Sequence, residues 1–133
     1  MNQYPVLFLT FKDVEGRSFD LAYGKLRTVI SDLCKKHVYL ETCDLVDTDD
    51  AEKFRRLKSE NGEESDIQNS LKTIMRMMNA VYRKPVILLI DEYDVPLSKA
   101  EETKNKEYYR QMLVFMKERK YSSSHGTHMN ICI

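Results

Sequence analysis

The spacing of hydrophobic residues changes along the chain, and each spacing predicts a different element. Residues 4–11 (YPVLFLTF) form a short apolar run typical of a strand, in which Pro5 is tolerated at the first position. After Ser18, apolar residues recur at three- and four-residue steps. This stripe predicts an amphipathic helix of roughly 18 residues, capped at its start by Ser18.

Two further helices and a second strand are expected in the middle of the chain. A short helix is expected around Ala51–Lys58, after a break near Asp47, and a longer one over Ser65–Tyr82. The longer helix begins with a capping-box pattern, Ser65-Asp-Ile-Gln68. Its expected buried face consists of Ile67, Leu71, Ile74, Met78 and Val81. The uninterrupted run 86–90 (VILLI) predicts a strand that is buried on both faces of a parallel sheet.

The order strand, helices, strand, helix predicts an α/β fold. Two apolar strands joined by a long helical crossover are expected to be parallel and right-handed. The sheet is expected to be incomplete, because two parallel strands give little cover to a run as apolar as 86–90. A last helix is expected over about Lys106–Lys120. Composition changes after it, so we expect a domain over 1–120 and a tail over 121–133, which is either flexible or a stub of another strand.

Composition and charge favour a globular protein and remove some classes of function. Of the 133 residues, 42% are hydrophobic and 32% charged, which suits one domain. Lysine plus arginine equals aspartate plus glutamate at 21 each, so the charge does not indicate binding to nucleic acid. The run 4–11 is too short to span a membrane. Cys34, Cys43 and Cys132 suggest no disulfide framework and no export signal is visible, so we expect a cytoplasmic protein.

The strand 86–90 leads directly into a group of carboxylates that begins with Asp91 and Glu92. A hydrophobic strand that ends in Asp-Glu is the Walker B pattern of P-loop nucleotide hydrolases. Because Mg²⁺ prefers carboxylates and water, Asp91 is the candidate magnesium residue. Glu92 is the candidate catalytic base, since a neighbouring carboxylate can orient and deprotonate the attacking water. The alternative interpretation is an acidic turn that only closes a strand.

Residues 84–96 (KPVILLIDEYDVP) resemble the Walker B segment of the bacterial AAA-ATPase-like family, whose members are described as predicted AAA ATPases. Residues 4–14 (YPVLFLTFKDV) are similar to the family's second strand, and the resemblance covers about residues 4–118. It implies a partial P-loop NTPase three-layer fold in which the two strands are neighbours. It also implies Mg²⁺ and ATP as ligands of the complete domain. Tyr93 and Asp94 match the family motif without an assigned role.

The chain departs from the family in its phosphate-binding loop. Such a loop has the pattern G-x-x-x-x-G-K-[ST], and the chain has only one Gly-Lys pair, Gly24-Lys25. Phe19 stands where the first glycine is required, and Leu26 replaces the serine or threonine. In the family this loop precedes the second strand. We therefore expect an interior piece of an ATPase domain that does not hydrolyse ATP by itself.

Other functions stay open at this point. A non-enzymatic binding module could associate with itself through an uncovered sheet edge. A metal-dependent nuclease could use Asp91, Glu92 and Asp94, although the D-(x)n-E-x-K arrangement of such enzymes does not occur around Asp91. His125, His128 and Cys132 form an imaginable zinc site, with an unstructured tail as the alternative.

Overall fold

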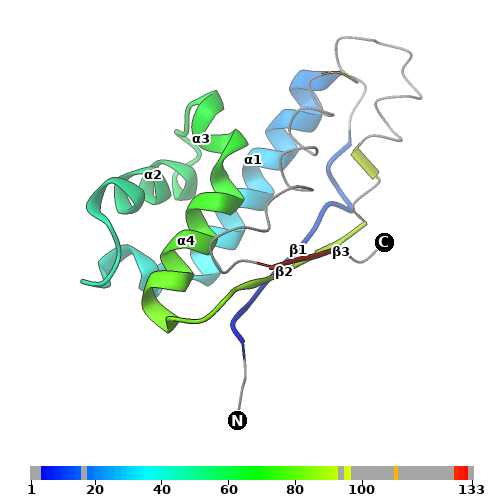
Figure 1. The fold of residues 1–133 in the computed structure, drawn as a ribbon. Coiled ribbons are helices and arrows are strands. Elements are labelled where there is room, and N and C mark those ends of the chain that lie inside the picture. The colour runs from blue at the N-terminus through cyan, green and yellow to red at the C-terminus, as the bar shows by residue number, and fades with distance from the viewer. Residues whose placement is uncertain (1–3, 16–17, 93–94, 97–109, 111–127, 132–133) are drawn as a thin grey trace.

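The computed structural model describes residues 4–15, 18–92, 95–96, 110 and 128–131 (Figure 1). Along the chain its elements are β1 (Val6–Thr10), α1 (Phe19–Lys36), η1 (Val38–Thr42), α2 (Thr48–Lys58), α3 (Glu64–Gln68), α4 (Ser70–Tyr82), β2 (Ile87–Asp91) and β3 (His128–Ile131). The predicted last helix lies outside the described residues, except for Arg110, which is helical. The mixed α/β composition that the sequence predicts is confirmed.

The three strands form one parallel sheet in the order β1-β2-β3, with β2 in the centre. Thr10 of β1 is aligned with Asp91 of β2, and Ile90 is aligned with Ile131 of β3. Just beyond β1, the amide of Phe11 donates a hydrogen bond of 2.9 Å to the carbonyl oxygen of Asp91. The predicted parallel pairing of the first two strands is therefore confirmed. β3 lies inside the segment for which the sequence left a strand stub and a flexible tail open.

The helices lie against one face of the sheet (Figure 1). Toward them point Leu7, Leu9, Leu88 and Ile90, all of which are buried. The alternate residues behave differently: Phe8 is 50% exposed, and Leu89 is half-buried. The expectation that strand 86–90 is buried on both faces is confirmed for the face toward the helices and is wrong for the other face, where Ile87 and Leu89 are half-buried. The expected three-layer fold stays a prediction, since the described residues make up one sheet and one layer of helices.

Among the described residues, one hydrophobic core joins the sheet to the helices. Its largest fully buried side chains are Leu7, Phe11, Leu26, Ile30, Leu40, Phe54, Leu57, Ile67, Leu71 and Ile74. Helix α2 packs against both α1 and α4, so these helices enclose the centre of the core. No helix in the described part of the chain is long and apolar enough to cross a membrane.

Local sequence signals place α1 correctly. The helix has 18 residues, and the amide of Leu21 donates a hydrogen bond of 3.4 Å to Oγ of Ser18, the predicted cap. A serine hydroxyl at this position accepts a bond from an amide that has no partner within the helix. Both the length and the start of this helix confirm the prediction from spacing.

The predicted helix over Ser65–Tyr82 is wrong in two respects. The chain is interrupted at Asn69, which separates α3 from α4. The capping box is formed by Glu63 and Asp66, two residues upstream of the predicted pair. The Asp66 carboxylate accepts a hydrogen bond of 3.0 Å from the amide of Glu63, and it also accepts one from an arginine of α2. The contact with α2 therefore favours Asp66 as the capping residue. Of the predicted inner face, Ile67, Leu71, Ile74 and Met78 are buried and Val81 is half-buried.

Two buried carboxylates tie the helices together through arginine. Asp50 of α2 is 3% exposed and accepts bonds of 2.8 and 2.6 Å from Nε and Nη2 of Arg76 in α4. Asp66 accepts bonds of 2.9 and 3.2 Å from Arg56, which lowers the pKa of the Asp66 carboxyl. Such two-pronged bonds fix orientation as well as distance. They set the positions of α2, α3 and α4 relative to one another.

We predict that Arg76→Met destabilises the domain. The variant leaves the Asp50 carboxylate buried without its partner, and such a loss costs about 2–3 kcal/mol. Urea unfolding followed by circular dichroism measures the change. Lys72→Met, at an exposed position of the same helix, is the matched control and should change stability by less than about 0.5 kcal/mol. Equal effects of the two substitutions would show that the Asp50–Arg76 pair makes no specific contribution.

Candidate functional site

The central strand carries both candidate acids to the carboxyl edge of the sheet. β2 ends at Asp91, and Glu92 follows it in a turn. Both residues are half-buried. The carboxyl edge of a parallel sheet is where ligands bind in open α/β folds. The structure thus places Asp91 and Glu92 together at a strand end, whereas their chemical roles stay predictions.

Glu92 has an unusual backbone conformation. Its φ is 57°, in the left-handed region that residues other than glycine rarely occupy. The amide of Val95 donates a hydrogen bond of 3.2 Å to the carbonyl oxygen of Glu92, and Val95 and Pro96 are helical. The chain therefore turns sharply at Glu92, and its side chain does not continue the alternation of β2. Strained residues of this kind cluster at functional sites.

A hydroxyl lies next to the first acid on the neighbouring strand. Thr10 is aligned with Asp91, and aligned residues of paired strands point to the same face of a sheet. That face is the one opposite the buried Leu88 and Ile90. Oγ1 of Thr10 accepts a hydrogen bond of 3.2 Å from the amide of Lys12. Sequence reasoning did not single out Thr10, because only the register of the two strands brings it beside Asp91.

The oxygen-rich composition of this edge suits magnesium. Mg²⁺ keeps several waters and is held by one or two carboxylates together with substrate phosphates. Asp91 and Glu92 offer that number of carboxylates. Among the described residues, no group of three or more His, Cys, Asp and Glu could hold a metal, so a metal site made wholly of such side chains does not occur there.

Several other candidate residues fall outside the site or outside the described part. Asp94, His125 and Cys132 are not among the described residues, and of the proposed zinc ligands only His128 lies in a described element, β3. The nuclease and zinc hypotheses therefore stay predictions. Gly24 lies inside α1, and a Cβ added to it would meet nothing within 4 Å. This glycine does not serve a close backbone approach, which agrees with its rejection as part of a phosphate loop.

The described cysteines do not offer a reactive thiol at this edge. Cys34 is fully buried in α1, and burial raises the pKa of its thiol to about 12. A thiol with so high a pKa stays protonated at neutral pH and is a poor nucleophile. Cys43 lies just after η1, and neither cysteine is in a disulfide.

A protein-family model described as Predicted AAA-ATPase matches residues 1–129 of the chain. The match includes β1, the helices and β2 in full, together with both candidate acids. This match confirms the family resemblance that residues 84–96 and residues 4–14 indicated. No curated protein and no solved structure matches the chain.

Because Glu92 has a left-handed conformation, we predict that glycine at position 92 is more stable than alanine, the reverse of the usual order inside a helix or strand. Both Glu92→Gly and Glu92→Ala remove the carboxylate, but only glycine adopts this φ without strain. We expect the glycine variant to be about 0.5–1 kcal/mol more stable than the alanine variant. Urea unfolding measures the difference.

The same pair of substitutions at Glu52, an exposed position inside α2, is the control. There the order should reverse, with glycine about 1 kcal/mol less stable than alanine. Glycine being the less stable variant at both positions would contradict the conformation of Glu92.

Proposed function

The chain belongs to the predicted AAA-ATPase family, and on that basis we propose that it carries the acidic part of a site that hydrolyses Mg-ATP. The observation that carries the proposal is the position of Asp91 and Glu92 at the carboxyl end of the central strand of a parallel sheet. A nucleotide site at this edge agrees with the general location of ligands in open α/β sheets.

In this proposal Asp91 is the residue that would hold the magnesium ion. The ion, when bound with ATP, neutralises charge on the phosphates. Asp91 is suited to this role because it is the last residue of β2, where the paired strand β1 fixes its backbone. The hydroxyl of Thr10, aligned on β1, is placed to hydrogen-bond a water on the same face.

Glu92 acts as the general base. Its carboxylate accepts a proton from the water that attacks the terminal phosphate, a role that requires a position close to Asp91. Glu92 directly follows Asp91, and its left-handed conformation ends the strand alternation that would direct the two side chains to opposite faces of the sheet. A half-buried carboxylate also keeps contact with solvent, from which the attacking water comes.

The phosphates of ATP need a second structural part. The 133-residue sequence contains no G-x-x-x-x-G-K-[ST] segment, and its only Gly-Lys pair lies inside α1. Without such a loop, positioning of the phosphates and most of the stabilisation of transition-state charge are missing. We propose that the complete domain hydrolyses ATP and that these 133 residues alone do not.

A second candidate function is association through the sheet. In the described part of the chain β1 is an edge strand, and on the face away from the helices Val6 and Phe8 are 43% and 50% exposed. Exposed apolar residues on a sheet edge favour pairing with another chain. This would make the chain a binding module, with the acids serving only to close a strand.

We predict that Glu92→Gln abolishes ATP turnover in a gene product that contains this sequence together with a G-x-x-x-x-G-K-[ST] segment. Loss of a general base lowers kcat by about 10²–10⁴-fold, while the affinity for Mg-ATP should change little because glutamine keeps the shape of the side chain. Phosphate release and calorimetry measure the two quantities.

Asp20→Asn, at an exposed position in the first turn of α1, is the control and should leave kcat unchanged. Turnover by Glu92→Gln at the rate of the unmodified protein would refute the role of Glu92. Clear hydrolysis by the 133-residue chain alone would refute the proposed need for a separate phosphate loop.

The association hypothesis predicts dimers or larger species that dissociate in Phe8→Glu, because a charge on this face opposes apolar contact. Light scattering over a range of concentrations measures the mass. Leu45→Glu, which changes an equally exposed leucine in a loop away from the sheet, should not alter it. A clean monomer of the unmodified chain at high concentration would exclude this function.

A further inference from the structure

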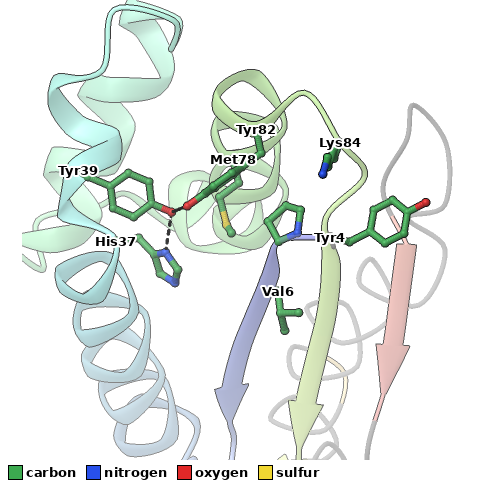
Figure 2. Close-up of a pocket in the computed structure, with 8 residues that line it drawn as sticks. Tyr4, Val6, His37, Tyr39, Met78, Tyr82 and Lys84 are labelled. Atoms are coloured by element: carbon green, nitrogen blue, oxygen red, sulfur yellow. Dashed lines mark hydrogen bonds between the residues drawn. The ribbon is translucent and has the colours of Figure 1, made fainter. Parts of the chain in front are cut away.

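A pocket of about 400 Å³ lies at the amino ends of β1 and β2 (Figure 2). The strands run from this pocket toward Asp91, so it is at the opposite edge of the sheet from the candidate acids. Its volume is within the range of sites that bind small molecules, about 300–1,000 Å³. Pro5, Val6 and Met78 supply apolar surface, and Tyr39 supplies an aromatic ring that is 40% exposed. The pocket therefore offers an apolar and partly open surface to a flat molecule.

One wall of the pocket is a row of three hydrogen-bonded side chains. Nδ1 of His37 is 3.2 Å from the hydroxyl oxygen of Tyr39, which is 2.9 Å from that of Tyr82 (Figure 2). The rings of the two tyrosines meet edge to face, with centroids 6.3 Å apart. His37 and Tyr39 adjoin η1, whereas Tyr82 ends α4, so the fold brings together residues 43 positions apart. Both hydroxyl groups are directed into this row.

The acidity of the three groups sets the direction of their hydrogen bonds. Burial lowers the pKa of His37 and raises that of Tyr39, so the imidazole and the phenol are both neutral at neutral pH. A phenol hydroxyl is a stronger donor than a neutral imidazole N–H, and an imidazole nitrogen is a stronger acceptor than a phenol oxygen. Tyr82 therefore donates to Tyr39, and Tyr39 donates to Nδ1 of His37. A neutral imidazole whose Nδ1 accepts carries its hydrogen on Nε2.

The Nε2–H group of His37 is the donor that this row leaves for a ligand. His37 is half-buried and lines the pocket, and within the described part of the chain only its Nδ1 has a side-chain hydrogen bond. Figure 2 shows Nδ1 on the side of Tyr39 and the other ring nitrogen on the side nearer β1 in this view. A ligand acceptor that replaces water at Nε2–H would keep the donor paired while the ring of the ligand covers apolar surface.

The pocket has no charge that is available to an ionic ligand. The described residues that line it include no carboxylate, and Lys84, the cation among them, has an interaction of its own. The imidazole of His37 is neutral, as argued above. A charged group that entered the pocket would lose hydration without gaining an opposite charge, which is costly. The lining therefore favours a neutral molecule.

We propose that this pocket binds a small, neutral aromatic molecule that carries a hydrogen-bond acceptor such as a carbonyl oxygen. The acceptor receives the hydrogen bond from Nε2–H of His37. The ring packs against Val6 and Met78 and against the ring of Tyr39. The proposal does not depend on ATP hydrolysis, since it concerns the other edge of the sheet.

The first measurement is the tautomer of His37 in the ¹⁵N-labelled chain. Long-range ¹H–¹⁵N spectra at neutral pH distinguish a ring nitrogen that carries hydrogen from one that accepts, and we expect the hydrogen on Nε2. Tyr39→Phe removes the donor to Nδ1 and should give a mixture of the two tautomers. A hydrogen on Nδ1 in the unmodified chain would overturn the assigned donor.

The second measurement is an NMR titration of the same chain with acetophenone, a neutral aromatic ketone. Saturating shifts at the amides of Val6, His37 and Tyr39 are expected. Toluene, which has the ring but no acceptor, should bind about 10-fold more weakly. Benzoate, which has acceptors but carries a charge, should also bind more weakly. Shifts that do not saturate with acetophenone, equal affinity for toluene, or tighter binding of benzoate would each overturn the proposal.

Two variants test the assigned donor. His37→Phe keeps a flat ring and removes the donor, so it should weaken binding of acetophenone about 10-fold and change binding of toluene little. Tyr39→Phe should reduce the preference for acetophenone by a smaller factor, because only part of the population then carries hydrogen on Nε2. Lys72→Gln, at an exposed position on α4, is the control and should bind both ligands as the unmodified chain does. Unchanged amide shifts outside the pocket verify that each variant is folded. An undiminished preference for acetophenone in His37→Phe would refute the proposed site.

Discussion

The parallel pairing of β1 with β2 is the contact on which the other features depend. It aligns Thr10 with Asp91 at one edge of the sheet and brings residues 4–6 together with the end of α4 at the other. Parallel strands need a long crossover, and the segment from α1 to α4 supplies it. Because the same pairing fixes both edges, the acids and the tyrosine-lined pocket have fixed positions relative to each other.

The crossover is held by charge as well as by apolar packing. A core of leucine, isoleucine and phenylalanine fixes how closely the helices approach, but such contacts are not directional. The Asp50–Arg76 and Asp66–Arg56 pairs add direction, since each arginine reaches both oxygens of a carboxylate that is almost buried. Residues 41–66 hold ten acidic and four basic side chains, and some of these acids therefore make internal contacts while others form solvated surface.

The two edges of the sheet differ in chemistry. The carboxyl edge presents oxygen atoms from Asp91, Glu92 and Thr10, which suit a hard cation and water. The amino edge has a pocket lined mainly by apolar and aromatic side chains, among them Pro5, Val6, Tyr39 and Tyr82. Neither set comes from one segment of sequence alone. Each combines the end of a strand with residues that the crossover or the neighbouring strand brings to it.

Local patterns in the sequence determined the elements whose causes are local. The helical spacing after Ser18 gave the length and cap of α1, and the apolar run before Asp91 gave β2 and the position of both acids at its end. Tertiary contacts decided the rest. Asp66 caps α3 because Arg56 binds it, Thr10 adjoins Asp91 because of strand register, and one-sided helical cover leaves Phe8 exposed. These depend on residues far apart in the chain, so hydrophobic period and capping patterns, which extend over a few residues, do not encode them.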